Sequence, residues 1–182
     1  MNLTKLFELQ RQLDAHIEKE HPRKSGEDRL AKKILALQVE LGELANEARF
    51  FKYWSHDQEP RTKVLAKDWF EGLQHYEEFK NPLLEEYADG LHFILSIGLE
   101  TGKYKEVEFQ ALYADEQDIV MQFNVLFDKV GDFYAYRTKG NYQIVLSLFL
   151  ALGEMLGFTW DQIEQAYIEK NQVNHHRQEA GY

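Results

Sequence analysis

Long runs of apolar residues at helical spacing, with prolines only between them, constrain the fold of this chain more than any other feature. The clearest run places Leu30, Ile34, Leu37, Leu41 and Leu44 at steps of four and three, which puts their side chains on one face of a helix. The chain has 3 prolines, and all of them lie between such runs. Long helices are therefore expected, because a proline ends or kinks a helix when it lies inside one.

The same spacing recurs along the chain and predicts an all-α helical bundle. Asn81 followed by Pro82 supplies a helix N-cap, and Thr159 with Gln162 forms a capping box. No segment resembles a β-hairpin or an internal repeat. The predicted helices are residues 2–21, 30–48, 83–100, 105–114, 116–136, 142–158 and 160–177, with a short helical pattern over 64–73. We expect residues 1–182 to form one domain, because this is an ordinary domain length and 44% of the residues are apolar.

Charge and cysteine content exclude several classes of function. The chain has 31 Asp and Glu against 21 Lys and Arg, a formal net charge of −10, which argues against binding to nucleic-acid polymers or anionic membranes. It has no cysteine, which removes disulfides, thiolate nucleophiles and thiolate metal sites. The amino terminus lacks the layout of a signal peptide, and the longest apolar stretch, 144–152, is too short to cross a bilayer. These features predict a soluble cytoplasmic protein.

Two pairs of acids lie beside apolar helical faces. Glu40 and Glu43 border the leucine stripe of their helix, and Glu86 and Asp89 share a face with Phe93. Unpaired carboxylates on such faces are costly to bury and repel one another, whereas a divalent cation removes both penalties. All-oxygen donors suit Mg²⁺ or Mn²⁺ better than zinc. The alternative is that these acids simply flank a seam of the bundle.

Iron is a rival metal, because di-iron helical bundles use Glu-x-x-His motifs on two helices. The nearest matches here are Asp89 with His92, and Glu18 with His21 in a strongly polar helix end. The second match is poor, and a lone histidine such as His92 is more often a hydrogen-bonded core residue than a ligand. Magnesium is therefore the preferred metal.

The spacing of these motifs resembles the all-α nucleotide pyrophosphohydrolases of the MazG-like superfamily. The resembling segments are Glu40-Leu-Gly-Glu43 and Glu86-Tyr-Ala-Asp89, the latter leading into Gly-Leu-His-Phe-Ile-Leu-Ser. Within this superfamily the chain is most similar to the dimeric dUTPases. That narrower resemblance rests on the Phe51-Lys52-Tyr53-Trp54 segment and on a carboxy-terminal segment running from Lys170 to Tyr182.

The resemblance implies a metal site and a reaction. Glu40, Glu43, Glu86 and Asp89 would be the ligands of two or three Mg²⁺ ions, with Mn²⁺ as a substitute. Glu43, or Glu40 beside it, would orient or deprotonate the attacking water. The implied reaction is hydrolysis of dUTP to dUMP and pyrophosphate by water attack on the α-phosphorus, with dUDP left open as a second substrate. Metal ions suit this chemistry because they neutralise phosphate charge and acidify water.

The carboxy-terminal segment is also consistent with a phosphate site. Lys170, Asn174 and Arg177 are at i, i+4 and i+7, so they share one face of the last predicted helix. Basic residues near a helix end also complement the helix dipole without any ligand. The resemblance implies that Lys170 and Arg177 bind phosphate, that Asn174 and Asn171 contact the nucleotide, and that Tyr182 closes over it.

Recognition of the base and the assembly of the protein are implied in the same way. Gln10 and Asp14 match the uracil-facing stretch of the first helix, although the family often has Asn where this chain has Asp14. A carboxylate accepts from the uracil N3 hydrogen but cannot donate, so a pyrophosphohydrolase of dCTP or of a damaged nucleotide remains an alternative. Lys52 and Trp54 would complete the site of the partner chain in a homodimer. A non-catalytic helical dimer is the alternative from another class.

Overall fold

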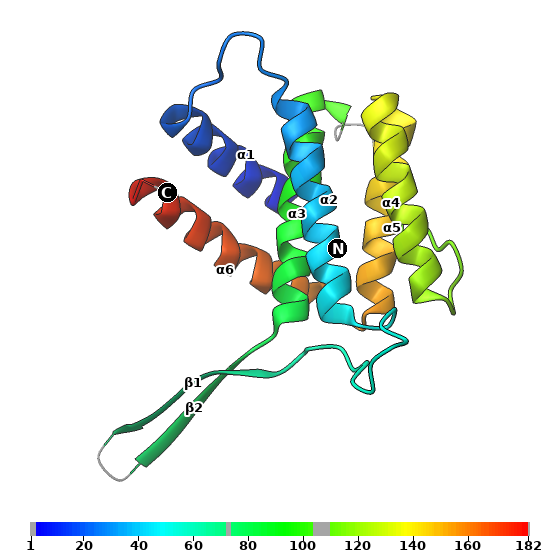
Figure 1. The fold of residues 1–182 in the computed structure, drawn as a ribbon. Helices are drawn as coiled ribbons and strands as arrows, with labels where there is room; N and C mark the ends of the chain where they lie inside the picture. Colours follow the sequence, from blue (N-terminus) through cyan, green and yellow to red (C-terminus); the bar gives the residue numbers. More distant parts are fainter. Residues whose placement is uncertain (1–2, 72–73, 104–109, 182) are drawn as a thin grey trace.

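The computed structural model describes residues 3–71, 74–103 and 110–181, with side chains outside 69–74. Within these ranges the chain forms helices and one pair of strands, shown in Figure 1. Their bounds are α1 (Leu3–Glu20), α2 (Arg29–Ala48), β1 (Val64–Glu71), β2 (Gln74–Lys80), α3 (Pro82–Thr101), α4 (Ile119–Ala135), α5 (Lys139–Met155) and α6 (Trp160–Glu179). The predicted all-α class is confirmed, with the strand pair as its one departure in the described ranges.

Helix α3 is the central element of the bundle. It packs against α1, α2, α5 and α6, and its face of Leu83, Tyr87, Leu91 and Ile94 is completely buried. In Figure 1, α2 lies along α3, α4 and α5 lie on one side of this pair, and α1 and α6 lie on the other. The acidic motif of α3 is therefore held on a rigid element surrounded by core.

The structure confirms that α3 and α6 begin at the capping residues predicted from the sequence. Asn81 accepts from the backbone N–H of Leu84, and Pro82 occupies the first turn of α3. Thr159 and Gln162 form a reciprocal capping box at the start of α6. These caps fix where α3 and α6 begin, and hence the positions at which their polar side chains emerge.

Close helix packing depends on glycine at a few positions. A Cβ atom on Gly98 of α3 would lie 2.1 Å from the hydroxyl oxygen of Tyr142. That hydroxyl donates to the carbonyl of Ile94 at 3.2 Å. The missing side chain of Gly98 therefore lets α5 approach α3 closely enough for this buried bond.

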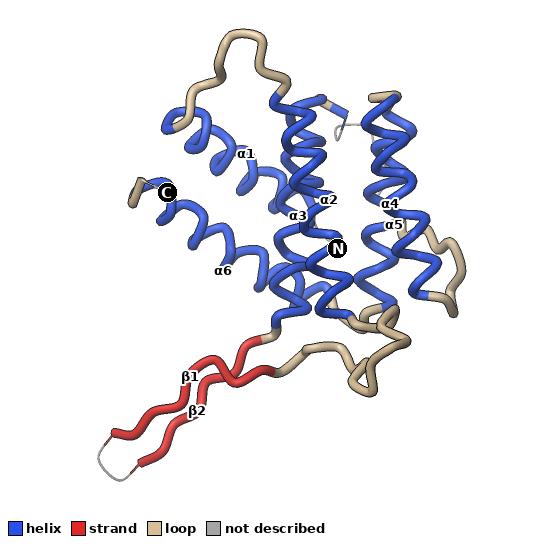
Figure 2. Tube along the Cα trace, in the orientation of Figure 1, coloured by secondary structure: helices blue, strands red, loops and turns tan. Residues whose placement is uncertain are grey.

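The short helix expected over 64–73 is wrong, and so is the expected absence of a hairpin. β1 and β2 pair antiparallel, with Leu65 opposite Phe79 and Glu71 opposite Gln74. Figure 2 shows this hairpin projecting from the bundle. Leu65 and Phe79 are exposed on it rather than buried in the core, so helical periodicity there carried no information.

The expected helix over 105–114 is also not supported. Residues 104–109 lie outside the described residues, and residues 110–118 form no helix. α4 begins at Ile119 rather than at residue 116, because Asp118 is the N-cap and accepts from the backbone N–H of Met121.

In the part of the chain that the structure describes, no single helix is long and apolar enough to cross a membrane. One pair of helices, α5 and α6, meets the length and composition criterion only as a unit bent by 111°, as buried core helices also can.

Candidate active site

The packing of α2 on α3 brings three of the predicted acids together. Carboxylate oxygens of Glu40, Glu43 and Glu86 all lie within 4.8 Å of one another. Glu40 and Glu86 are half-buried, and Glu43 is exposed. Three convergent oxygen donors of this kind fit a hard divalent cation such as Mg²⁺.

The cluster perturbs the acidity of its own members. Burial, followed by the nearby charges of Asp89 and Glu43, raises the pKa of Glu40 to about 7. Burial and then Asp89 and Glu43 raise the pKa of Glu86 to about 7 as well. Like charges brought together out of water favour the protonated form. Such a cluster binds protons when no cation compensates its charge.

The fourth predicted acid, Asp89, faces α6. Its carboxylate accepts a hydrogen bond from the Lys170 ammonium at 2.5 Å. Burial raises the pKa of Asp89, and Lys170 opposes that increase. Asp89 also contributes to the raised pKa values of Glu40 and Glu86. It therefore belongs electrostatically to the acidic cluster while its own charge is paired with a lysine.

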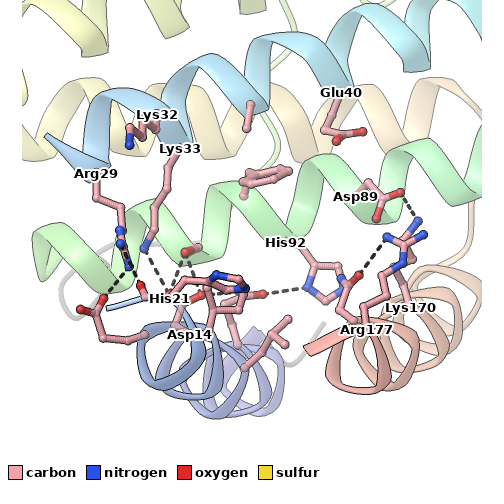
Figure 3. Close-up of a pocket in the computed structure, with 18 residues that line it drawn as sticks. Asp14, His21, Arg29, Lys32, Lys33, Glu40, Asp89, His92, Lys170 and Arg177 are labelled. Atoms are coloured by element: carbon pink, nitrogen blue, oxygen red, sulfur yellow. Dashed lines mark hydrogen bonds and ion pairs between the residues drawn. The ribbon is translucent and has the colours of Figure 1, made fainter. Parts of the chain in front are cut away.

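A cavity of about 440 Å³ opens beside this cluster. Its walls come from α1, α2, α3 and α6, and Figure 3 shows Glu40 and Asp89 at one end, with Arg29 and Lys33 at the other. The lining residues are Gln10, Leu13, Asp14, Ile17, Glu18, His21, Arg29, Lys32, Lys33, Ala36, Glu40, Asp89, His92, Phe93, Ser96, Lys170, Asn174 and Arg177.

The polar face predicted for the last helix lines this cavity. Lys170, Asn174 and Arg177 of α6 all line it, and Figure 3 shows Lys170 and Arg177 beside Asp89. Asn171 is buried at 5% exposure and does not line the cavity. Tyr182 lies outside the described residues. The cavity therefore has two cations of α6 next to the acids of α2 and α3.

The two predicted base-contacting residues also line the cavity. Gln10 is buried on α1, and its amide nitrogen donates to Asp14 at 2.7 Å. The Gln10 carbonyl accepts from the Tyr167 hydroxyl at 2.6 Å and lies 2.8 Å from Nδ1 of His92. Burial lowers the pKa of His92 to about 3, so its ring is neutral and Nδ1 donates. Two donors to the carbonyl fix the orientation of the Gln10 amide.

Lys52 and Trp54 do not line this cavity. The Lys52 ammonium donates to the backbone and side-chain oxygens of Asn46, at 3.2 and 2.6 Å. Trp54 is 65% exposed and packs edge-on against Phe51 and Tyr53. Their predicted role involves a second chain, so it stays a prediction.

Several cavity residues were not predicted from the sequence. On α3, Ser96 follows Asp89 by seven residues, and on α2, Lys33 precedes Glu40 by seven residues. Extending each acidic motif by two helical turns along the same face would have found them. His92 is the hydrogen-bonded core histidine that the sequence favoured over a metal ligand, and its ring stacks on Tyr167 with ring centroids 3.9 Å apart.

The all-α bundle, with carboxylates from two packed helices beside a cavity that lysine and arginine line, fits the class of all-α nucleoside triphosphate pyrophosphohydrolases that the motif spacing resembles. Comparison with known families narrows this class. A family model described as dUTPase matches residues 2–79 and 73–182. The chain therefore belongs to the dimeric, all-α dUTPase family, and the protein is a dUTP diphosphatase. A search of curated proteins found no match.

Proposed function

We propose that this dUTP diphosphatase is Mg²⁺-dependent and forms dUMP and pyrophosphate by water attack on the α-phosphorus. The observation that carries this proposal is the group of three convergent carboxylates beside a cavity that Lys170 and Arg177 of α6 line. Family membership supports dUTP as the substrate. The water oxygen forms a bond to the α-phosphorus. The bond between the α-phosphorus and the oxygen that bridges to the β-phosphate breaks, and pyrophosphate leaves with that oxygen.

The donor set fits magnesium. Glu40, Glu43 and Glu86 would hold it through oxygen atoms, and Asp89 would join them when Lys170 moves away. Two or three ions per site, with Mn²⁺ as a substitute, are consistent with this number of carboxylates. When bound, Mg²⁺ supplies charge neutralisation for the triphosphate and a more acidic water.

The protein residues have distinct roles in this proposal. Glu43 is the exposed member of the cluster, so its carboxylate can reach the attacking water, and Oε accepts the proton that the water releases. Glu40 is the second candidate for this role. Lys170 and Arg177 bind phosphate oxygens, and Asn174 contacts the deoxyuridine. Asn171 supports this helix from its buried side, and Tyr182 closes over the nucleotide.

The enzyme is proposed to be a homodimer whose site is completed across the interface. Phe50 and Phe51 are both exposed and line an apolar groove between α2 and α4 that also includes Phe123 and Phe127. Trp54 and Lys52 follow directly in the chain. Exposed aromatic residues at this density are typical of interfaces. If a second copy covers this groove, Lys52 and Trp54 of the first copy would help to complete the cavity of the second copy.

The test is to incubate the purified protein with each deoxynucleoside triphosphate and Mg²⁺ and to measure pyrophosphate. We expect release from dUTP, none in the presence of excess EDTA, and recovery with added Mg²⁺ or Mn²⁺. Including dUDP in the panel decides whether it is also a substrate. Turnover of dUTP that persists without any divalent cation would contradict the proposed metal dependence.

If Asp14 alone contacted the base, dCTP would be a second candidate substrate. Asp14 is a carboxylate in the cavity, and a carboxylate can accept a hydrogen bond from the exocyclic amine of cytosine. If dCTP were hydrolysed faster than dUTP in the same panel, the substrate would be reassigned while the proposed metal site stood.

A further inference from the structure

Asp14 is surrounded by hydrogen-bond donors from three helices. Gln10 of α1 donates to Oδ1 at 2.7 Å, and Lys33 of α2 lies 3.5 Å from Oδ2. The Ser96 hydroxyl of α3 lies 2.9 Å from Oδ1 and 2.7 Å from Oδ2. The two nitrogen donors therefore approach different oxygens of one carboxylate, and the carboxylate lies between them.

Lys33 balances the charge of this carboxylate. Its ammonium also contacts Glu100 at 2.7 Å, and its side chain is only 18% exposed. A partly buried carboxylate without a nearby cation would be costly in this position. Lys33 thus accounts for how the chain tolerates Asp14, and it places a cationic donor on the cavity wall.

Each of these groups keeps capacity for one further hydrogen bond. The Gln10 amide nitrogen has two protons and directs one to Asp14, and the Lys33 ammonium has three and directs two to Asp14 and Glu100. A carboxylate accepts about four hydrogen bonds, and Gln10, Ser96 and Lys33 supply three. All of these residues line the cavity, so a ligand can use what remains.

Because Asp14 lies between Gln10 and Lys33, the hydrogen bonds still available to a ligand have the order donor (Gln10), acceptor (Asp14), donor (Lys33). The edge of uracil presents acceptor, donor, acceptor through O2, N3–H and O4, which is the complementary order. Cytosine presents O2 and N3 as acceptors and N4 as donor. Its N3 lone pair would face the Asp14 carboxylate and its amine would face a donor, so both positions would be mismatched.

We propose that Lys33, acting with Asp14 and Gln10, is a specificity-determining residue that reads the uracil edge. This inference rests on the proposed function, because it assumes that the base of dUTP occupies this part of the cavity. Lys33 supplies the second donor that an asparagine at position 14 would otherwise supply. Ser96 is a positioning residue, since its single proton holds the carboxylate in place.

The test compares Lys33→Met with the double variant Asp14→Asn, Lys33→Met. Binding of dUMP and dCMP is measured by calorimetry, and kcat/KM is measured for dUTP and dCTP. We expect Lys33→Met to reduce the preference for uracil by roughly tenfold to a hundredfold, the range for one charge-assisted hydrogen bond. The double variant, which restores neutrality and supplies an amide donor, is expected to recover most of that preference.

Lys19→Met is the matched control. Lys19 carries the same charge but does not line the cavity, and its ammonium pairs with Glu20 at 3.1 Å. We expect its uracil preference to equal that of the wild type. Should both Lys33 variants fold and keep wild-type preference, or should wild type bind dCMP as well as dUMP, the inference is overturned. A wild type that hydrolyses no dUTP would instead overturn the proposed function.

Discussion

At the scale of single residues, the carboxylates of α2 and α3 differ in exposure although their spacing is the same. Glu40 and Glu86 are half-buried, whereas Glu43 is exposed beside them. Burial suits a residue that holds a cation in a fixed position, and exposure suits one that exchanges protons with water. We therefore propose separate tasks for acids that look equivalent in the sequence.

Replacing Glu43 with Gln should reduce kcat by roughly a hundredfold to ten-thousandfold, the range for loss of a general base. The amide keeps the shape of the side chain but cannot accept the proton. Steady-state kinetics with dUTP at saturating Mg²⁺ measures this change. Glu47→Gln is the control, because Glu47 lies one turn further along α2 and pairs with Arg61 at 3.4 Å. Equal kinetics in the two variants would contradict the role of Glu43.

Without a divalent cation, the stability that Glu40 and Glu86 contribute should fall as the pH rises. The pKa of a glutamate is ordinarily 4.5, and burial beside other acids raises that of Glu40 and that of Glu86 to about 7. Between these values each of the two binds more protons in the folded state than in the unfolded state, so its contribution decreases from about pH 4.5 to about pH 7. Allowing for solvent screening, each group contributes about 1 to 2 kcal/mol.

Thermal melts in EDTA at constant ionic strength measure this dependence. The variant Glu40→Gln, Glu86→Gln lacks both titrations, so the melting temperature of the wild type minus that of the variant should fall between about pH 4.5 and about pH 7. The lowered pKa of His92 contributes in the opposite direction in both proteins, and the difference removes it. A difference that rose over this range would contradict the assigned pKa shifts.

At the scale of elements, the sequence predicts helices where apolar periodicity coincides with a cap. Asn81 and Thr159 mark the starts of α3 and α6, and the structure confirms both. The helix predicted over 64–73 is wrong because β1 lies in a projecting hairpin, where Leu65 is exposed and no core selects a helical face. The acidic pairs are predictable because each lies within one helix. The pairing of Asp14 with Lys33 is not, because it depends on how α1 packs on α2.

Removing the hairpin should leave the bundle intact. β1 and β2 contact each other extensively, and Leu65 and Phe79 remain exposed. Replacing residues 64–80 with a short Gly-Ser linker retains the anchor at Arg61, whose carbonyl accepts from the backbone N–H of Leu83. We expect the melting temperature to change by less than about 3 °C, or about 1 kcal/mol for this size. A large loss of stability, measured by calorimetry, would show that the hairpin supports the bundle.

At the scale of the whole molecule, the surplus of negative charge has a local organisation. The formal net charge is −10, yet a polyanionic nucleotide is the substrate. The cavity combines acids at one end with Lys170 and Arg177 beside them. If Lys170 and Arg177 bind phosphate as proposed, the attraction for the nucleotide is local to this cavity, while the molecule as a whole stays negatively charged.

The proposed homodimer predicts a linked loss of assembly and activity. Phe51→Asp places a charge in the apolar groove of α2 and α4, so the variant should sediment as a monomer and lose most dUTP hydrolysis. Analytical ultracentrifugation and kinetics on the same samples measure both effects. Tyr134→Asp, a similar change at an exposed residue of α4 outside the groove, is the control. A fully active monomer would contradict a shared site.

The contact between Lys170 and Asp89 makes the two kinds of ligand interdependent. While the ammonium is paired with Asp89, it satisfies a carboxylate that a cation would otherwise use, and it is withheld from phosphate. A triphosphate that draws Lys170 away releases Asp89, and a cation that takes Asp89 releases Lys170. If Asp89 holds metal and Lys170 binds phosphate as proposed, each ligand would strengthen the binding of the other by the same factor, by thermodynamic reciprocity. We therefore expect nucleotide and metal to bind together more tightly than either binds alone.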